Sequence, residues 1–385
     1  MTSRVLVAPD SFKGSLTSLQ VTDAIATGWA RVRPADQIDR CPISDGGAGL
    51  LDALRAADSS WQPLPVASRD PLGRPIGARF LRSGERAVVE LADASGLGRV
   101  GRDERDAGTA STFGTGLTLA AAIGLGVREV ILGVGGSATT DGGSGLLAAL
   151  GARFLDAQGN ELPPGGAALA RLARVDLGGL SSVLAEVRLT VASDVTNPLL
   201  GPSGAAAVYG PQKGASPGQV AALDAALARY ADVLEAAAGR SIRDVPGAGA
   251  AGGTVAGLLA IADRFAAFAV RSGVEEVMGL VRFAERLAGS TLVITGEGRV
   301  DAQTAFGKTA YGVARRAAEA GVPCLALGGS VTPEGEAALA ALGAITVSAS
   351  EGPGTLEDAM AAGAAPLERT AGRIARLVTL GSRLA

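Results

Sequence analysis

The chain contains no histidine, and this absence excludes every catalytic arrangement that depends on an imidazole. Serine–histidine–aspartate triads, histidine general bases and histidine-ligated zinc sites are all ruled out. Any catalysis must therefore depend on carboxylates, lysine, arginine, hydroxyl groups and backbone amides. Phosphoryl transfer fits this set, because it depends mainly on positioning and on charge neutralisation.

Cysteine, long apolar runs and basic tracts are scarce as well. The two cysteines, Cys41 and Cys324, lie far apart in the sequence and form no metal-spaced pair, so we expect a disulfide-free protein. The most apolar stretch, residues 254–270, is interrupted by Asp263 and Arg264, and the N-terminus lacks the layout of a signal peptide. With a net charge of −3 and no basic patch, the sequence predicts a cytoplasmic protein without a membrane or nucleic-acid partner.

Lysine is nearly absent too, although the chain has 35 lysine and arginine residues in total. Only Lys13, Lys213 and Lys308 are lysines, and each has a glycine as a direct neighbour in the sequence. Lysine presents a compact point charge, whereas arginine is broad and forked. Positions that exclude arginine are therefore candidate anion sites in tight glycine-containing loops.

The residues that are abundant indicate the fold class. A length of 385 residues favours two domains. Alanine, valine and leucine supply most of the 47% hydrophobic content, and only 3% of the residues are aromatic. Apolar runs alternate with helical patterns, which predicts an α/β protein with mostly parallel sheets. Helices are expected over residues 18–31 and 217–238, a strand over 291–295, and hairpin-like strands within 61–97.

The strongest local signal is the glycine-rich segment 133–145, GVGGSATTDGGSG, which follows a predicted strand and opens a helix. Backbone amides at such a place bind anions, so a phosphate or substrate site is favoured over a tight turn without a ligand. The dinucleotide fingerprint, with Asp156 on the ribose, fits less well because Thr-Thr-Asp-Gly-Gly separates it from the helix. The candidate anion-binding residues of this segment are Gly135, Gly136, Ser137, Thr139, Asp141, Gly142 and Gly143.

A second loop is predicted over residues 295–301, TGEGRVD, and the chain continues to a Gly-Lys-Thr sequence at a helix start. This second part departs from the P-loop pattern because Ala302 replaces its first glycine. Lys308 is a candidate phosphate ligand, and Glu297 and Asp301 are candidate Mg²⁺ ligands. Helix capping is the alternative role for these two carboxylates.

A third group of polar residues follows the ends of predicted strands. It consists of Asp10 with Lys13, Asp45, and Asp194 with Asn197. In open α/β sheets, ligands bind at the carboxyl ends of the strands, so these side chains are expected to converge. They suit either metal binding or proton abstraction from a substrate hydroxyl, although a single aspartate after a strand is often a turn or cap residue.

Ten segments in order along the chain resemble the bacterial type I glycerate kinase family. They are 8–15 (APDSFKGS), 42–47 (PISDGG), 69–71 (RDP), 94–97 (ASGL), 111–116 (STFGTG), 135–143 (GGSATTDGG), 194–199 (DVTNPL), 209–215 (YGPQKGA), 249–253 (GAAGG) and 295–301 (TGEGRVD). The resemblance implies ATP-dependent phosphorylation of D-glycerate to 2-phosphoglycerate or 3-phosphoglycerate, with Mg²⁺. The chain departs from the family pattern at Ala48, Leu117, Thr140 and Ala310, which bears on substrate range more than on reaction class.

The resemblance also implies an architecture. A flavodoxin-like domain would comprise residues 1–60 and 290–385, a second α/β domain would be inserted over 61–289, and the active site would lie in the cleft between them. The protein would act on glycerate and ATP as a monomer or a homodimer.

Roles within this site are expected as follows. MgATP would lie against the loop 135–143, and Lys308 would clamp phosphate. One of Lys13, Lys213 and Arg69 would hold the substrate carboxylate, and Asn197 would assist in substrate binding. Among the three strand-end aspartates, Asp194 is favoured as the base. Three alternatives remain open, namely a kinase for another small hydroxy acid, a dinucleotide-dependent oxidoreductase, and a non-catalytic binding protein.

Overall fold

The computed structural model describes residues 3–306, 308–352 and 354–381. The chain forms two compact units, each containing residues that are distant in the sequence. Unit 1 comprises Met1–Asp45, Asp52–Ser59 and Ser272–Ala385, and unit 2 comprises Gly46–Leu51 and Ser60–Arg271. No helix in the described part of the chain has the length and apolar character needed to cross a membrane.

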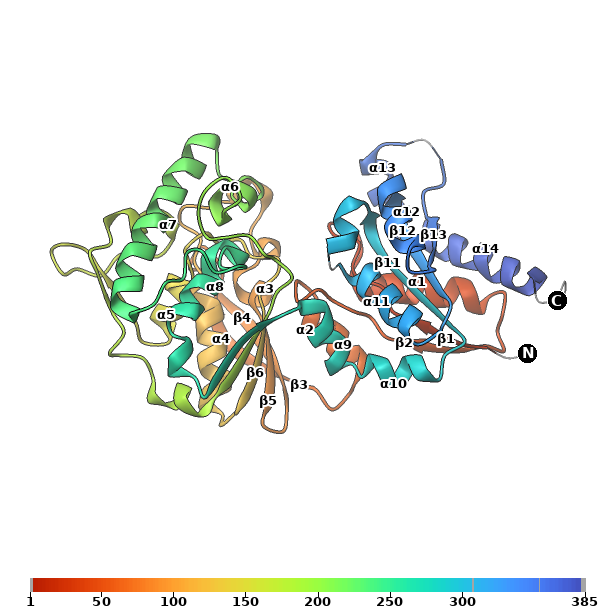
Figure 1. The fold of residues 1–385 in the computed structure, drawn as a ribbon, viewed down its shortest axis with the longest axis horizontal. Helices are drawn as coiled ribbons and strands as arrows, with labels where there is room; N and C mark the ends of the chain where they lie inside the picture. Colours follow the sequence, from red (N-terminus) through yellow and green to blue (C-terminus); the bar gives the residue numbers. More distant parts are fainter. Residues whose placement is uncertain (1–2, 307, 353, 382–385) are drawn as a thin grey trace. The chain divides into compact units, whose positions relative to one another are not determined.

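Unit 1 is built on a sheet of five parallel strands in the order β13-β12-β11-β1-β2 (Figure 1). The strands are β1 (Arg4–Val7), β2 (Gln37–Arg40), β11 (Leu292–Val300), β12 (Cys324–Val331) and β13 (Ile345–Ser348). Counted within the unit, this is the flavodoxin-like order 2-1-3-4-5. The α/β fold class with a flavodoxin-like sheet is therefore confirmed.

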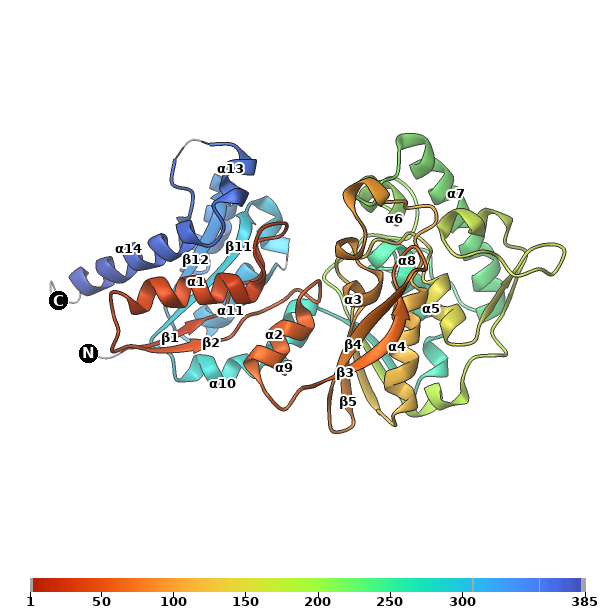
Figure 2. The ribbon, with the colours of Figure 1, turned by 180° about the vertical axis from the view of Figure 1, so that it is seen from behind.

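Helices cover both faces of this sheet. They are α1 (Ser18–Ala30), α2 (Leu50–Ala57), α9 (Gly273–Leu280), α10 (Phe283–Ala288), η7 (Ala302–Phe306), α11 (Thr309–Glu319), α12 (Pro333–Ala340), α13 (Leu356–Ala361) and α14 (Ala365–Gly381). The first and last helices, α1 and α14, lie side by side on one face (Figure 2). Their backbones approach so closely that a Cβ atom on Gly28 would lie 2.0 Å from the carbonyl oxygen of Glu368.

Residues 272–289 belong to unit 1, whereas the resemblance to glycerate kinases placed them in the inserted domain. Glu275 on α9 forms ion pairs with Arg315 and Arg316 on α11. On α10, Nη1 of Arg286 donates a hydrogen bond of 2.6 Å to Asp39 in β2. The two helices thus pack on unit 1 before the chain enters β11.

Unit 2 contains a six-stranded mixed sheet in the order β10-β9-β6-β5-β4-β3 and a separate two-stranded sheet. The strands are β3 (Gln62–Arg69), β4 (Pro75–Ser83), β5 (Arg86–Glu90), β6 (Glu129–Gly133), β7 (Arg153–Leu155), β8 (Arg174–Asp176), β9 (Arg188–Ala192) and β10 (Ala267–Arg271). The predicted hairpin is the antiparallel pair β3–β4, and β5, β6, β9 and β10 run parallel.

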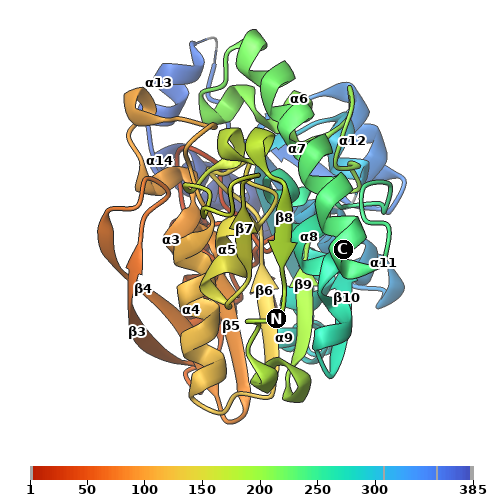
Figure 3. The ribbon, with the colours of Figure 1, turned by 90° about the vertical axis from the view of Figure 1, so that its left-hand side faces the viewer.

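The helices of unit 2 pack around a core that includes Phe80, Leu119 and Tyr230. They are α3 (Leu91–Ser95), η1 (Leu97–Arg99), η2 (Arg102–Glu104), α4 (Phe113–Gly124), α5 (Ser144–Ala149), η3 (Gly166–Arg171), η4 (Ser182–Glu186), α6 (Ala205–Tyr209), η5 (Pro211–Lys213), α7 (Pro217–Ala238), α8 (Ala250–Ala260) and η6 (Ala262–Arg264). In Figure 3, α4, α5 and α8 lie across one face of the sheet.

One expectation about these elements is wrong. Residues 295–300, predicted as a loop, continue β11 and pair in register with β12, for example Glu297 with Gly328. The glycines misled the prediction: a Cβ atom on Gly296 would lie 2.4 Å from the carbonyl oxygen of Leu327, so glycine here permits close strand packing. Asp156, the ribose ligand in the less favoured dinucleotide alternative, instead accepts hydrogen bonds from the backbone amides of Gln158 and Asn160 in the turn after β7.

Candidate active site

The carboxyl-terminal edge of the unit 1 sheet collects acidic residues from three strands. After β1 the chain continues beside β11, with Ala8 N donating to Ile294 O and Asp10 N to Gly296 O at 2.8 and 2.9 Å. Asp45 lies five residues beyond the end of β2, and Glu297 lies within β11 itself. This edge includes the point where the strand order reverses around β1, which is where open α/β sheets bind their ligands.

Asp10 is 7% exposed, and both of its carboxylate oxygens accept hydrogen bonds. Ser11 N donates to Oδ1, and Oγ1 of Thr309 donates to Oδ2, both at 2.6 Å. Burial, followed by the charge of Asp45, raises the pKa of Asp10 to about 7, although Thr309, Lys13 and Ser11 counteract part of the rise. A carboxyl with such a pKa is suited to exchange protons near neutral pH.

Lys13 supplies a cation directly beside this carboxyl. Its Nζ lies 2.6 Å from Oδ2 of Asp45, while 74% of its side chain stays exposed. The charge of Asp45 is the main cause that raises the pKa of Lys13, so the ammonium group stays protonated at neutral pH. Lys13 is therefore a charged, accessible group for an anionic ligand.

Glu297, Asp301 and Lys308 lie together, as the sequence predicted. Nζ of Lys308 is 3.2 Å from Oδ1 of Asp301 and 4.0 Å from Oε2 of Glu297. Burial raises the pKa of Glu297, which also accepts a hydrogen bond of 2.5 Å from Oγ1 of Thr304. Burial acts in the same direction on Asp301, but the hydrogen bond and charge of Lys308 outweigh it and lower the pKa of Asp301.

The glycine-rich loop of unit 2 connects β6 to α5 and is held by the protein itself. Asp141 is fully buried, and its oxygens accept hydrogen bonds from Thr112 N and Oγ1 and from the backbone amides of Gly143 and Gly145, at 2.8 to 3.2 Å. Burial raises the pKa of Asp141, and these donors counteract the rise. Asp141 thus joins the start of α4 to the start of α5.

The glycines of this loop lie against neighbouring helices. Gly142 and Gly143 have positive φ values of 64° and 76°. A Cβ atom on Gly142 would lie 2.5 Å from Tyr230 on α7, and one on Gly143 would lie 3.0 Å from Thr254 on α8. Close packing alone therefore accounts for glycine at these two positions, and their role in nucleotide binding stays a prediction.

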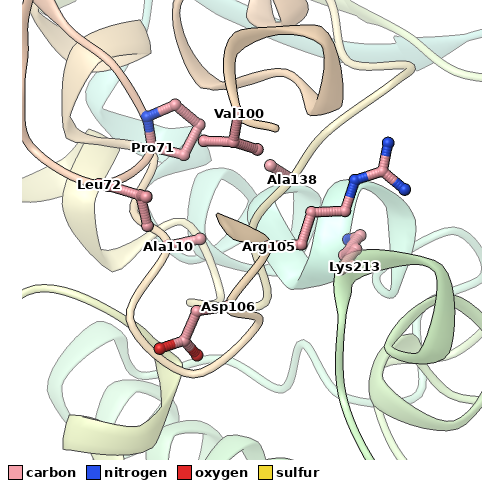
Figure 4. A pocket seen from close by; sticks show the side chains of 8 residues that line it. All are labelled: Pro71, Leu72, Val100, Arg105, Asp106, Ala110, Ala138 and Lys213. Atoms are coloured by element: carbon pink, nitrogen blue, oxygen red, sulfur yellow. The ribbon is translucent and has the colours of Figure 1, made fainter. Parts of the chain in front are cut away.

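Lys213 is 2% exposed and donates a hydrogen bond of 2.5 Å to the carbonyl oxygen of Thr139 in this loop. Burial lowers its pKa to about 7, and the charge of Asp141 acts in the opposite direction. It lines a small recess in which Arg105 is the other cationic residue (Figure 4). The other residues that line the recess are Pro71, Leu72, Val100, Asp106, Ala110 and Ala138.

The remaining predicted residues also belong to unit 2. Asp194 follows the carboxyl end of β9 by two residues. Arg69, at the end of β3, donates from Nη1 to the carbonyl oxygen of Gly73 at 2.8 Å. Asn197 accepts from the hydroxyl of Tyr209 and donates to Ser203 O, both at 2.8 Å, so its side chain holds the loop that follows β9.

Sequence reasoning missed three residues that organise these clusters. Thr309 and Thr304 donate to Asp10 and Glu297, and Glu90 accepts from the backbone amides of Gly49 and Leu51 at the start of α2. The partners of Thr309 and Glu90 are 299 and about 40 positions away. The sequence signal at Thr309 was the Gly-Lys-Thr motif, and that motif indicated a phosphate ligand for its side chains rather than an aspartate partner for Thr309.

The described residues contain no group of three or more acidic or thiol side chains arranged to hold a metal ion. Mg²⁺ commonly binds to one or two carboxylates together with substrate phosphates. Glu297 and Asp301 offer oxygen donors of that kind, so their chemistry fits a magnesium ion that arrives with a nucleotide.

Comparisons with known proteins give one consistent result. Residues 5–379 match the model of the Glycerate kinase family. A glycerate kinase of Bacillus subtilis (strain 168) is 41% identical over 383 residues, which is 99% of both chains. A glycerate 2-kinase of Escherichia coli (strain K12) is 40% identical over 333 residues, or 86% of both chains.

The fold is likewise similar to a solved structure. A crystal structure assigned to glycerate kinase 2 of Salmonella typhimurium LT2 superposes with a TM-score of 0.81. The two chains are 39% identical, and the match covers all of both.

Proposed function

The chain belongs to the glycerate kinase family, and from this premise we propose that it transfers the γ-phosphoryl group of ATP to a hydroxyl of D-glycerate. The observation that carries the proposal within the molecule is the cluster of Asp10, Lys13 and Asp45 at the carboxyl edge of the unit 1 sheet. It combines a buried carboxyl whose pKa is about 7 with an accessible cation. These groups suit a small hydroxy acid, which carries one carboxylate and a hydroxyl to be deprotonated.

We further propose that the product is 2-phosphoglycerate and that the chain belongs to the bacterial type I branch. Support for the product comes from the relative described as a glycerate 2-kinase, which is 40% identical to this chain. Support for the branch comes from the ten motif segments found in order along the sequence.

Asp10 is the proposed general base. Its carboxylate would accept the proton of the substrate hydroxyl while the oxygen attacks the γ-phosphorus and ADP leaves. Lys13 would bind the substrate carboxylate, with Lys213 and Arg69 as further candidate cations. Asp194, favoured from the sequence, remains the second candidate base, because it too follows the carboxyl end of a strand.

The nucleotide would bind to the glycine-rich loop 135–143, with Lys308 on its phosphates. Glu297 and Asp301 would hold Mg²⁺, which neutralises charge on the phosphate oxygens when it is bound. In the structure Lys308 lies between these two carboxylates, so nucleotide binding would exchange one of its partners for a phosphate.

An ADP-release assay with a panel of hydroxy acids tests this function. We expect ADP release with ATP and D-glycerate, and weaker release with L-glycerate, tartronate or hydroxypyruvate. Release with another acid and none with D-glycerate would identify a kinase for a different substrate. Absence of ADP release with every acid would reject the kinase assignment for this chain.

A further inference from the structure

Thr309, the first residue of α11, lies far in sequence from Asp10 and in direct contact with it. Its side chain is fully buried, and its Oγ1 lies 2.6 Å from Oδ2 of Asp10. A threonine hydroxyl carries a single proton to donate. Because that proton is directed to Asp10, the Gly-Lys-Thr motif does not use it for a phosphate oxygen.

The other role expected of a threonine at this place is helix capping. The N-cap of α11 is Lys308, whose side chain forms no capping hydrogen bond. By contrast, α1 begins with a capping box in which Thr17 and Gln20 exchange hydrogen bonds. Thr309 is therefore used differently from the threonine that starts α1.

The hydrogen bond from Thr309 fixes the orientation of the Asp10 carboxylate. The terminal torsion of aspartate is broad, so one hydrogen bond to Oδ1 from Ser11 leaves the carboxylate plane poorly defined. A second donor on Oδ2 fixes that plane. The charged groups that act on Asp10 are Asp45 and Lys13, and Nζ of Lys13 donates its hydrogen bond to Asp45.

We propose that Thr309 is a positioning residue for phosphoryl transfer, whose hydroxyl holds the Asp10 carboxylate in the orientation that accepts the proton of the substrate hydroxyl. This inference rests on the proposed function, in which Asp10 is the base. Thr309 itself touches neither substrate nor nucleotide in this account. Thr309 lies at the start of α11, which follows β11, and Asp10 lies just after β1. Their contact therefore joins the segments that follow these two neighbouring strands.

The test compares Thr309→Val, which keeps the shape and removes the hydroxyl, with Thr309→Ser, which keeps the hydroxyl. Thr309→Val should lower kcat by about tenfold to a hundredfold while leaving KM for ATP nearly unchanged, because only the orientation of the base is lost. The acid limb of the pH–rate profile should move up by about one pH unit, since a donor to the carboxylate has been removed. Thr309→Ser should restore most of the rate and the original profile.

Thr22→Val is the matched control for loss of a buried hydroxyl in unit 1. Thr22 is 2% exposed, and its Oγ1 donates to the carbonyl oxygen of Ser18 at 2.7 Å, within α1. This variant should lower Tm without moving the pH–rate profile. If Thr309→Val does not fold, Thr309→Ala carries the same test, because it removes the hydroxyl without adding bulk.

A carbon-13 NMR titration of the Asp10 carboxyl separates this inference from the proposed function, because it needs no turnover. A higher pKa of Asp10 in Thr309→Val than in the wild type supports the contact, even if glycerate is not the substrate. An unchanged pKa, or unchanged kcat in an active enzyme, overturns the positioning role. Equal loss of kcat in Thr309→Val and Thr309→Ser also overturns it, because the hydroxyl then does not matter.

Discussion

At the scale of single residues, burial raises the pKa of Asp10 and so sets the pH range in which this carboxylate can act as a base. A general base must be deprotonated, and the pKa of Asp10 is about 7. We therefore predict that kcat/KM for glycerate rises about tenfold per pH unit below pH 7 and levels off above it. Asp10→Asn should lose roughly a hundredfold or more in kcat and lose this acid limb, as measured by initial rates between pH 5.5 and 9.

Asp194→Asn is the comparison for this prediction. If it abolishes turnover and Asp10→Asn does not, then Asp194 is the base.

The stability of Asp10→Asn provides a folding control. The folded pKa of Asp10 exceeds the ordinary value of 3.8, so this group destabilises the folded state increasingly as pH rises from about 4 to about 7. Asp10→Asn should therefore melt no lower than the wild type at pH 8.

The variant Lys213→Arg tests whether this position holds a lysine because an arginine does not fit. Its side chain is 2% exposed, so the larger guanidinium of Lys213→Arg should lower the free energy of unfolding by about 1–3 kcal/mol. Lys13→Arg is the control, since 74% of that side chain is exposed and the change should stay within about 0.5 kcal/mol. Equal urea midpoints for both variants would refute the steric argument at Lys213.

At the scale of elements, the glycine-rich loop is shaped by the helices packed against it. Gly142→Ala should be strongly destabilising, because φ is 64° and the new Cβ would lie 2.5 Å from Tyr230. Gly126→Ala is the matched control, with φ of 80° and no atom within 4 Å of the new Cβ. We expect Gly126→Ala to cost about 1 kcal/mol and Gly142→Ala about 2 kcal/mol more, measured by urea denaturation. Equal costs would mean that Tyr230 moves aside.

Elements with local start signals could be predicted from the sequence. The helices over 18–31 and 217–238 were placed correctly, because Thr17 and Ser216 begin α1 and α7 with capping boxes. The end of β11 could not be predicted, because its glycines are typical of loops. Only the pairing with the neighbouring strand β12 shows why they lie in a strand. Likewise, the strand-end position of Asp10 was evident, but its contact with Thr309 depends on a fold that brings distant residues together.

At the scale of the whole molecule, both ends of the chain build the sheet of unit 1. Its strand β1 pairs with β2 on one side and, on the other, with β11, which comes from the other end of the chain. Composition and periodicity predicted an α/β protein, and only the resemblance to glycerate kinases predicted that a second domain interrupts the first. The expected end of the inserted domain at residue 289 lies after α9 and α10, although both helices belong to unit 1. The boundary was placed there because β11, the first strand that the sequence pattern shows clearly, begins only after these two helices.

We propose that this molecule phosphorylates glycerate and that Asp10 takes part in the step. Phosphorus-31 NMR of a reaction containing enzyme, MgATP and D-glycerate tests this proposal most directly. We predict ADP and 2-phosphoglycerate in equal amounts with the wild type, and almost no product with Asp10→Asn at the same concentration. Inorganic phosphate in place of phosphoglycerate, or undiminished product with Asp10→Asn, would contradict it.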